Sequence, residues 1–139
     1  MEDKMIKYLL MSLVASTVSA TNIENCFNVA AKQYQIPNKL LKAIAKTETG
    51  LNPLAVHTNA NHSYDLGIMQ INSTWLPQLK RVGIDKAELL DGCKNIQIGA
   101  WILAQNIKRY GLTRKAIGAY NASTPVLQEK YAQLVMKNM

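Results

Sequence analysis

Apolar residues recur at intervals of three and four along most of the chain, and no segment sustains the strict alternation of a half-buried strand. The pattern predicts a mainly α-helical fold of the α+β type, built as a single globular domain. A polar stretch over residues 57–63, rich in Asn, predicts a loop or a small irregular hairpin. The helices are expected over about residues 23–34, from 37 or 38 to near 50, around 75–79, around 96–107, and over 113–120 and 126–136.

Several of these helices carry their own end signals. Pro37 and Asn38 open the second helix, and Gly50 suits a left-handed cap at its C-terminal end. Asn72 or Ser73 is placed to cap the short helix that follows the Asn-rich stretch. These signals support the helical interpretation of the apolar pattern.

The first twenty residues are typical of a secretory signal peptide, which leaves residues 21–139 as the mature domain. Lys4 and Lys7 precede an apolar run over residues 8–18, and small residues lead to a cleavage position after Ala20. A bilayer span needs about 20 apolar residues. Because this run is much shorter, removal of the leader is favoured over a membrane anchor.

The chain is basic. Its predicted signal peptide places the mature domain in the periplasm. Its 139 residues carry a formal net charge of +7. The Lys and Arg residues are scattered in pairs, without the long basic run or interleaved aromatic residues of a nucleic-acid groove. We therefore expect no nucleic-acid partner. No other stretch is long and apolar enough to span a membrane, so we expect no membrane contact after signal cleavage. We also expect a monomer. An acidic polymer such as the cell wall is a sufficient partner for the basic surface.

Cys26 and Cys93 both lie in the expected mature domain. An even pair of cysteines in an exported protein is more often a disulfide than two free thiols, so we expect the two to be bonded. Closing a loop of this length stabilises a fold by about 4 kcal/mol in the chain-entropy model.

Glu48 stands where the second helix is expected to place an apolar residue. It follows Ile44 by four positions and Leu41 by seven, on the continuation of the buried face. Loss of water and the negative end of the helix dipole both favour the neutral form of a carboxyl group there. An acid that keeps its proton near neutral pH can act as a general acid. From position alone, the alternative is a glutamate that bends out to solvent.

Asp65 is the best local candidate for the second group that glycoside cleavage usually needs, a nucleophile or a base. It precedes a segment in which Gly67 allows close backbone approach. In the same segment, Gln70 and Asn72 carry amides that suit sugar hydroxyls and acetamides. These residues alone leave structural alternatives open, with Gln70 as a buried amide that bridges loops and Asn72 as a helix cap.

The sequence gives no sign of a cofactor. His57 and His62 are the only histidines, and their spacing matches no common zinc arrangement. There is no glycine-rich phosphate-binding motif and no nucleophile elbow. We therefore expect no metal site and no organic cofactor.

Three motifs, in order, make the chain recognisable at the level of a family. They are Glu-Thr-Gly-Leu-Asn-Pro over residues 48–53, Gly-Ile-Met-Gln-Ile-Asn over residues 67–72 and Ala-Tyr-Asn-Ala over residues 119–122. The chain resembles the lytic transglycosylases of the lysozyme-like fold. More closely, it is similar to their small exported members associated with type III secretion, type IV pili and conjugation systems. The likeness covers almost all of the expected mature domain, including both cysteines.

The resemblance implies roles for individual residues. Glu48 takes the place of the family's single catalytic acid, and Gln70 falls on the Gln of its Gly-x-Met-Gln motif. Tyr120 is expected near the catalytic glutamate, and Asn121 is expected to help shape the glycan groove. In the related enzymes Gly commonly follows this last motif, whereas this chain has Ser123.

A second resemblance bears on the mechanism. Residues 64–75 are also similar to the active-site stretch of c-type lysozymes, in which an Asp stands at the position of Asp65. By analogy, this likeness implies hydrolysis with two carboxylates. A transglycosylase instead uses Glu48 first as acid and then as base, while the C6 hydroxyl of muramic acid closes a 1,6-anhydro ring. Asp65 can stabilise positive charge in either scheme.

The family likeness predicts a peptidoglycan lytic transglycosylase that cleaves the bond between N-acetylmuramic acid and N-acetylglucosamine. It also predicts local opening of the wall for a secretion, pilus or conjugation apparatus. Two alternatives remain, a lysozyme-type muramidase that uses Glu48 and Asp65, and a non-catalytic assembly factor that binds peptidoglycan. The intact Glu48, Gln70 and Tyr120 argue against the binding-only alternative.

Overall fold

The computed structural model describes residues 22–139, and the leader predicted over residues 1–20 lies outside them. Helical residues 22–34 come first, followed by further helices and one small sheet. The prediction of a mainly helical α+β domain is confirmed. The remaining α-helices are α2 (Asn38–Thr49), α3 (Leu76–Lys80), α4 (Gly92–Tyr110), α5 (Arg114–Gly118) and α6 (Pro125–Lys137).

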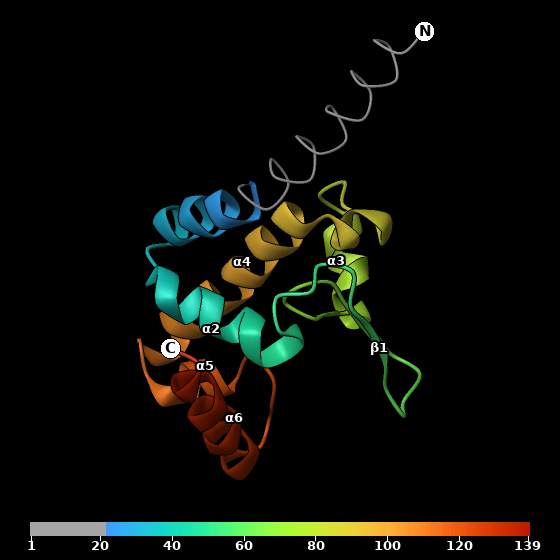
Figure 1. The fold of residues 1–139 in the computed structure, drawn as a ribbon. Coiled ribbons are helices and arrows are strands. Elements are labelled where there is room, and N and C mark those ends of the chain that lie inside the picture. The colour runs from blue at the N-terminus through green and yellow to red at the C-terminus, as the bar shows by residue number, and fades with distance from the viewer. Residues whose placement is uncertain (1–21) are drawn as a thin grey trace, which may run out of the picture.

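Helix α4 runs near the centre of the molecule (Figure 1). Helices α5 and α6 follow it and form the C-terminal end of the fold. The apolar face predicted for α4 is buried, including Ile96, Ala100 and Leu103. It shares one core with Leu41 and Ile44 of α2. Each fully buried aliphatic side chain of this size contributes about 1.5–3 kcal/mol to stability.

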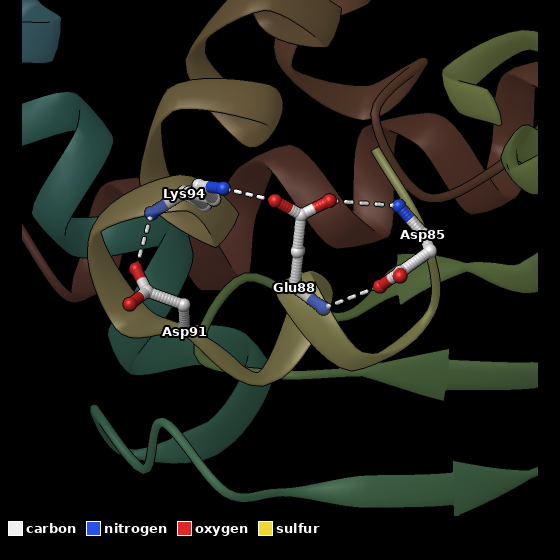
Figure 2. Close-up of polar contacts among 4 residues, drawn as sticks. All are labelled: Asp85, Glu88, Asp91 and Lys94. Atoms are coloured by element: carbon white, nitrogen blue, oxygen red, sulfur yellow. Dashed lines mark hydrogen bonds and ion pairs between the residues drawn. The ribbon is translucent and has the colours of Figure 1, made fainter. Parts of the chain in front are cut away.

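A network of four charged residues fixes the start of α4 (Figure 2). The Asp91 carboxylate caps the helix by accepting a hydrogen bond from the backbone N–H of Lys94 (2.9 Å). The backbone N–H of Asp85 donates to the Glu88 carboxylate (2.9 Å), and the N–H of Glu88 donates back to Asp85 (3.2 Å). The Lys94 ammonium donates to Glu88, and these contacts hold the pKa of Glu88 below its usual value. Helix α4 therefore begins before its apolar pattern does.

Three short antiparallel strands form a sheet in the order β1 (Val56–Thr58), β2 (Tyr64–Leu66), β3 (Ile71–Asn72). The hairpin predicted around residues 57–63 is present as β1, its loop and β2. Asp65 lies on the central strand, opposite Asn72. The sequence did not predict β3, because a strand of two residues is too short to show alternation.

Cys26 and Cys93 form a disulfide with their Cα atoms 5.3 Å apart, which confirms the predicted pairing. The bridge ties helical residues 22–34 to the first turn of α4 across 67 residues of sequence. Within residues 22–139, none of the helices combines the length and apolar character that crossing a membrane requires.

Candidate active site

A polar cleft of about 940 Å³ opens between the sheet and the C-terminal helices. The hairpin loop and the sheet line one side of it. The end of α2 and the loop between α5 and α6 line the other. The cleft therefore collects residues that are far apart in the sequence. All six residues predicted for the site line it: Glu48, Asp65, Gln70, Asn72, Tyr120 and Asn121.

Glu48 reaches the cleft from the last turn of α2, four residues after the buried Ile44. Gly50 ends the helix with a left-handed φ of 61°. Thr49 anchors this end, because its hydroxyl donates a hydrogen bond to the backbone carbonyl of Ile68 (2.8 Å). The glutamate is thus directed toward the cleft and α6 instead of bulk solvent.

The Glu48 carboxyl group accepts a hydrogen bond from the Tyr131 hydroxyl of α6, with an oxygen–oxygen distance of 2.5 Å. Burial raises the pKa of Glu48 above its usual value, and the nearby charge of Asp65 adds to the rise. The hydrogen bonds from Tyr131 and Asn121 lower this pKa, but the effect of burial is larger. The surroundings of Glu48 therefore favour an acid that keeps its proton.

Tyr120 and Tyr131 stack beside Glu48, with ring centroids 6.5 Å apart and ring planes inclined by 15°. The Tyr120 hydroxyl donates to the backbone carbonyl of Met69 (2.8 Å), so this ring braces the loop of the second motif. Burial raises the pKa of both phenols, and the charge of Glu48 adds to the rise, so both remain hydrogen-bond donors. Sequence reasoning missed Tyr131, whose only signal is its place on the apolar face of α6.

Asp65 faces the cleft from β2 in a cradle of amides. The side-chain amide of Asn72 donates to one carboxylate oxygen (2.8 Å), and that of Asn59 donates to the other (3.0 Å). The carbonyl oxygen of the Asn72 side chain also accepts the backbone N–H of Thr74 (3.0 Å) and caps the 3-10 turn η1 (Ser73–Trp75). Asn59 was missed because nothing in the sequence separates it from the other asparagine of its loop.

Gln70 ends a tight turn that begins at Gly67, and both residues adopt left-handed φ angles of 53° and 79°. The Gln70 amide donates to the backbone carbonyls of Gly67 (3.0 Å) and Ala55 (3.3 Å), so it bridges two loops at the edge of the cleft. The buried Asn95 of α4 accepts a hydrogen bond from the backbone N–H of Met69 (2.8 Å). A Cβ atom on Gly67 would lie 2.2 Å from this asparagine, which explains the glycine.

The cleft offers groups that can hydrogen-bond a carbohydrate, together with two carboxyl groups. Its asparagine and serine side chains suit sugar hydroxyls and acetamides, and Trp75 lines it with its ring edge-on to Trp101 (5.5 Å between centroids). The exposed His57 and His62 are not among its lining residues. Across residues 22–139, no three His, Cys, Asp or Glu side chains are grouped in a way that could hold a metal ion.

Comparison with known proteins shows the family to which this chain belongs. The family model described as the transglycosylase SLT domain matches residues 25–134. Invasion protein IagB of Salmonella typhi is 40% identical over 119 residues, which cover 82% of this chain and 74% of the relative. Protein IpgF of Shigella flexneri is 39% identical over 107 residues, which cover 76% of this chain and 70% of the relative.

Among solved structures, the inactive mutant of the lytic transglycosylase Slt from Pseudomonas aeruginosa matches with a TM-score of 0.68 and 18% identity. The match covers 82% of this chain but 22% of the Slt chain, so this protein corresponds to about a fifth of that much longer one. At this identity the match shows the fold. Together with the family model, it agrees with the resemblance carried by the three motifs. The chain belongs to the transglycosylase SLT family and is a peptidoglycan lytic transglycosylase.

Proposed function

We propose that Glu48 performs both proton transfers in cleavage of the β-1,4 bond between N-acetylmuramic acid and N-acetylglucosamine. Glu48 first gives its proton to the bridging oxygen as the bond from that oxygen to C1 of muramic acid breaks. The carboxylate then takes the proton of the C6 hydroxyl, whose oxygen bonds to C1 and closes the 1,6-anhydro ring. The raised pKa of the partly buried Glu48 carries this proposal, because the first step needs a protonated acid.

Asp65 is proposed to stabilise the positive charge that develops at the anomeric carbon in an oxocarbenium-like transition state. Its carboxylate is held by two amides at 2.8 Å and 3.0 Å, so little reorganisation is needed when the charge appears. The same fixed carboxylate favours the second candidate function, a muramidase that hydrolyses this bond with Glu48 and Asp65. Hydrolysis leaves a reducing muramic acid, and transglycosylation leaves an anhydro ring.

The remaining predicted residues are proposed to shape and line the glycan groove. Gln70 and Tyr120 act through the backbone that they hold, since their polar atoms bond to carbonyls of neighbouring loops. Asn72 contributes both to the groove and to the placement of Asp65. Asn121 lies at the groove and also interacts with Glu48, so it can contact the sugar beside the bond that breaks.

The biological role is proposed to be local opening of the cell wall for a secretion, pilus or conjugation apparatus. IagB is described as an invasion protein, and it is similar to this chain over most of the length of both. The predicted leader supports a periplasmic location, where the enzyme meets peptidoglycan. We expect the apparatus, or one of its components, to be the partner that directs where the wall is cut.

The decisive experiment is mass spectrometry of the products that the purified protein releases from isolated peptidoglycan. We expect products ending in 1,6-anhydromuramic acid, absent when Glu48→Gln is used and unchanged with Glu24→Gln, a surface control. Hydrated reducing ends would move the assignment to the muramidase. The absence of any product dependent on Glu48 would favour the non-catalytic assembly factor, for which Glu48→Gln should support assembly of the apparatus as well as wild type.

A further inference from the structure

A second groove in the surface is apolar, in contrast to the polar catalytic cleft. It has a volume of about 310 Å³ and lies between α3, α4 and the end of the first helix (residues 22–34). Most of its lining is aliphatic or aromatic and includes Leu79, Val82, Ile84, Ile98 and Trp101. No charged side chain is among the residues that line it. We call this surface the apolar groove.

The rim of the apolar groove leaves apolar surface open to water. Val82 has 72% of its surface exposed, whereas Leu79 and Ile98 are buried and belong to the core. The volume of the groove lies at the lower end of the roughly 300–1,000 Å³ that is typical of ligand pockets. The groove can therefore accept one or two apolar side chains, which would also cover Val82.

Two cations border the apolar groove. Lys80 and Arg81 come immediately before Val82, and both are exposed. Neither takes part in the ion pairs found in the part of the chain that the structure describes. The next acid along the chain is Asp85, whose carboxylate accepts the backbone N–H of Glu88 (3.2 Å). The groove therefore combines an apolar floor with two positive charges that are free to bind an acidic partner.

Two tryptophans connect the apolar groove with the catalytic cleft. Trp101 lines the groove and Trp75 lines the cleft, and their rings meet edge-on with centroids 5.5 Å apart. The groove and the cleft nevertheless share no lining residue. A molecule in the groove would therefore leave the path of the glycan free, so that a partner can be bound while the enzyme works on the wall.

We infer that the apolar groove binds a segment of a partner protein in which large apolar side chains are flanked by acidic residues. The apolar side chains cover Val82 and the floor of the groove, and the acidic residues pair with Lys80 and Arg81. A helix that lays its apolar face in a groove has this form. The segment is complementary to the groove in apolar character and in charge. This inference rests on the part of the proposed function that expects a partner to direct where the wall is cut, and it is independent of the proposed reaction.

Binding of a short labelled peptide tests the apolar groove directly. The peptide presents two leucines between glutamates, and a comparison peptide carries lysines in place of the glutamates. Fluorescence anisotropy measures the binding of each peptide to the purified protein. The acidic peptide should bind saturably and more weakly as salt is added, and the lysine peptide should bind about tenfold more weakly or less. Absence of saturable binding, or equal binding of the two peptides, overturns the inference.

A matched pair of valines locates the binding. Val82→Asp should weaken binding of the acidic peptide by about tenfold or more, because it places a carboxylate among apolar side chains. Val126→Asp is the control, because Val126 of α6 is also 72% exposed but lies outside the groove. Both variants should keep the Tm of wild type, since both valines are exposed. Equal weakening by the two variants overturns the inference.

A matched pair of cation sites tests the charge. Lys80→Gln combined with Arg81→Gln should weaken binding of the acidic peptide about fivefold, as expected for two exposed ion pairs. Lys108→Gln combined with Arg109→Gln changes the same exposed dipeptide at the end of α4 and should leave binding unchanged. An equal effect of the two double variants would show that the peptide responds only to the net charge of the protein, which overturns the inference.

Other occupants of the apolar groove would give different results. Self-association of the protein, or its binding to phosphatidylglycerol vesicles, that Val82→Asp abolishes would assign the groove to a second copy or to a lipid surface and overturn the inference. Release of anhydro products tests the proposed reaction separately, because it depends on Glu48 in the cleft. Val82→Asp should leave that release from isolated peptidoglycan unchanged, so failure of the inference and failure of the proposed reaction are distinguishable.

Discussion

Two carboxylic acids face the cleft from its two sides. We call the side formed by the end of α2 and the loop between α5 and α6 the helical wall, and the side formed by the three-stranded sheet the sheet wall. Glu48 lies in the last turn of α2, whose apolar face is buried in the core, and burial holds the pKa of Glu48 above the usual value. Asp65 lies on the middle strand of a small sheet, where two side-chain amides donate to its oxygens. The helical wall favours a retained proton on Glu48, and two amides of the sheet wall hold the Asp65 carboxyl group in place. The surroundings of the two carboxyl groups therefore differ, in line with the two different tasks proposed for them.

The two walls are also electrically coupled. The negative charge of Asp65 raises the pKa of Glu48, while the hydrogen bond from Tyr131 lowers it. Changes on the two walls should consequently move the pH dependence of the reaction in opposite directions, although both should reduce the rate.

The largest effect is expected from Glu48→Gln, which keeps the size of the side chain but removes the transferable proton. Since general acid and base catalysis contributes about 10²–10⁴-fold to a rate, activity should fall by roughly 10³-fold. Product release from peptidoglycan measures the loss, and thermal unfolding shows whether the fold is retained. A folded Glu48→Gln protein with activity within tenfold of wild type would show that Glu48 is not the general acid.

A smaller loss is expected from Asp65→Asn, about 10²-fold, which is typical of removing one preorganised electrostatic group. The same change removes the charge that raises the pKa of Glu48, so that pKa should fall. Because the first step needs protonated Glu48, the alkaline limb of the profile of kcat/KM against pH should move to lower pH. An alkaline limb that stays at the wild-type pH would show that the charge of Asp65 does not raise the pKa of Glu48.

Tyr131→Phe should reduce activity by less than about tenfold, because it removes one hydrogen bond and leaves the acid in place. Without that hydrogen bond the pKa of Glu48 should rise, so the alkaline limb should move to higher pH, opposite to Asp65→Asn. The same pH profile measures both shifts. Tyr110→Phe, which changes a tyrosine at the end of α4 outside the cleft lining, should leave the limb unmoved.

The smallest effect is expected in stability. A carboxyl group whose pKa is raised by folding contributes stability at low pH and loses that contribution as pH rises through the folded-state value. Glu48→Gln has no such titration and can still accept the hydrogen bond from Tyr131. Its Tm should therefore rise relative to wild type as pH increases from the usual pKa of a glutamate through the higher folded-state pKa of Glu48. A constant difference across this range would mean that burial of Glu48 carries no cost.

Much of the helical wall could be predicted from the sequence. The apolar spacing of Leu41 and Ile44 placed Glu48 on the buried face, and Gly50 marked the end of the helix. Local periodicity and capping are encoded within one or two helical turns, so they can be recognised without knowing the fold. The pairing of Cys26 with Cys93 was also predictable, because a chain that is predicted to be exported and has two cysteines can form one intramolecular disulfide.

The sheet wall was less predictable, because its strands are two or three residues long and show no periodicity. Asp65 and Asn72 were recognised from their residue types and from the family likeness. Their mutual contact, and the second amide from Asn59, depends on how the hairpin folds back on β3. Asn95 of α4 likewise accepts the backbone N–H of Met69, in the second motif, only because α4 lies against the turn that begins at Gly67.

By itself the sequence determined the mainly helical fold, the position of the acid on a buried helical face and the family. Only the tertiary structure decided which partners surround the two carboxyl groups. Tyr131 lies 83 residues from Glu48 along the chain and donates to it because α6 packs against α2. Helical periodicity acts over a few residues, whereas burial and charge coupling act through space, so the pKa of Glu48 emerges only when distant segments meet.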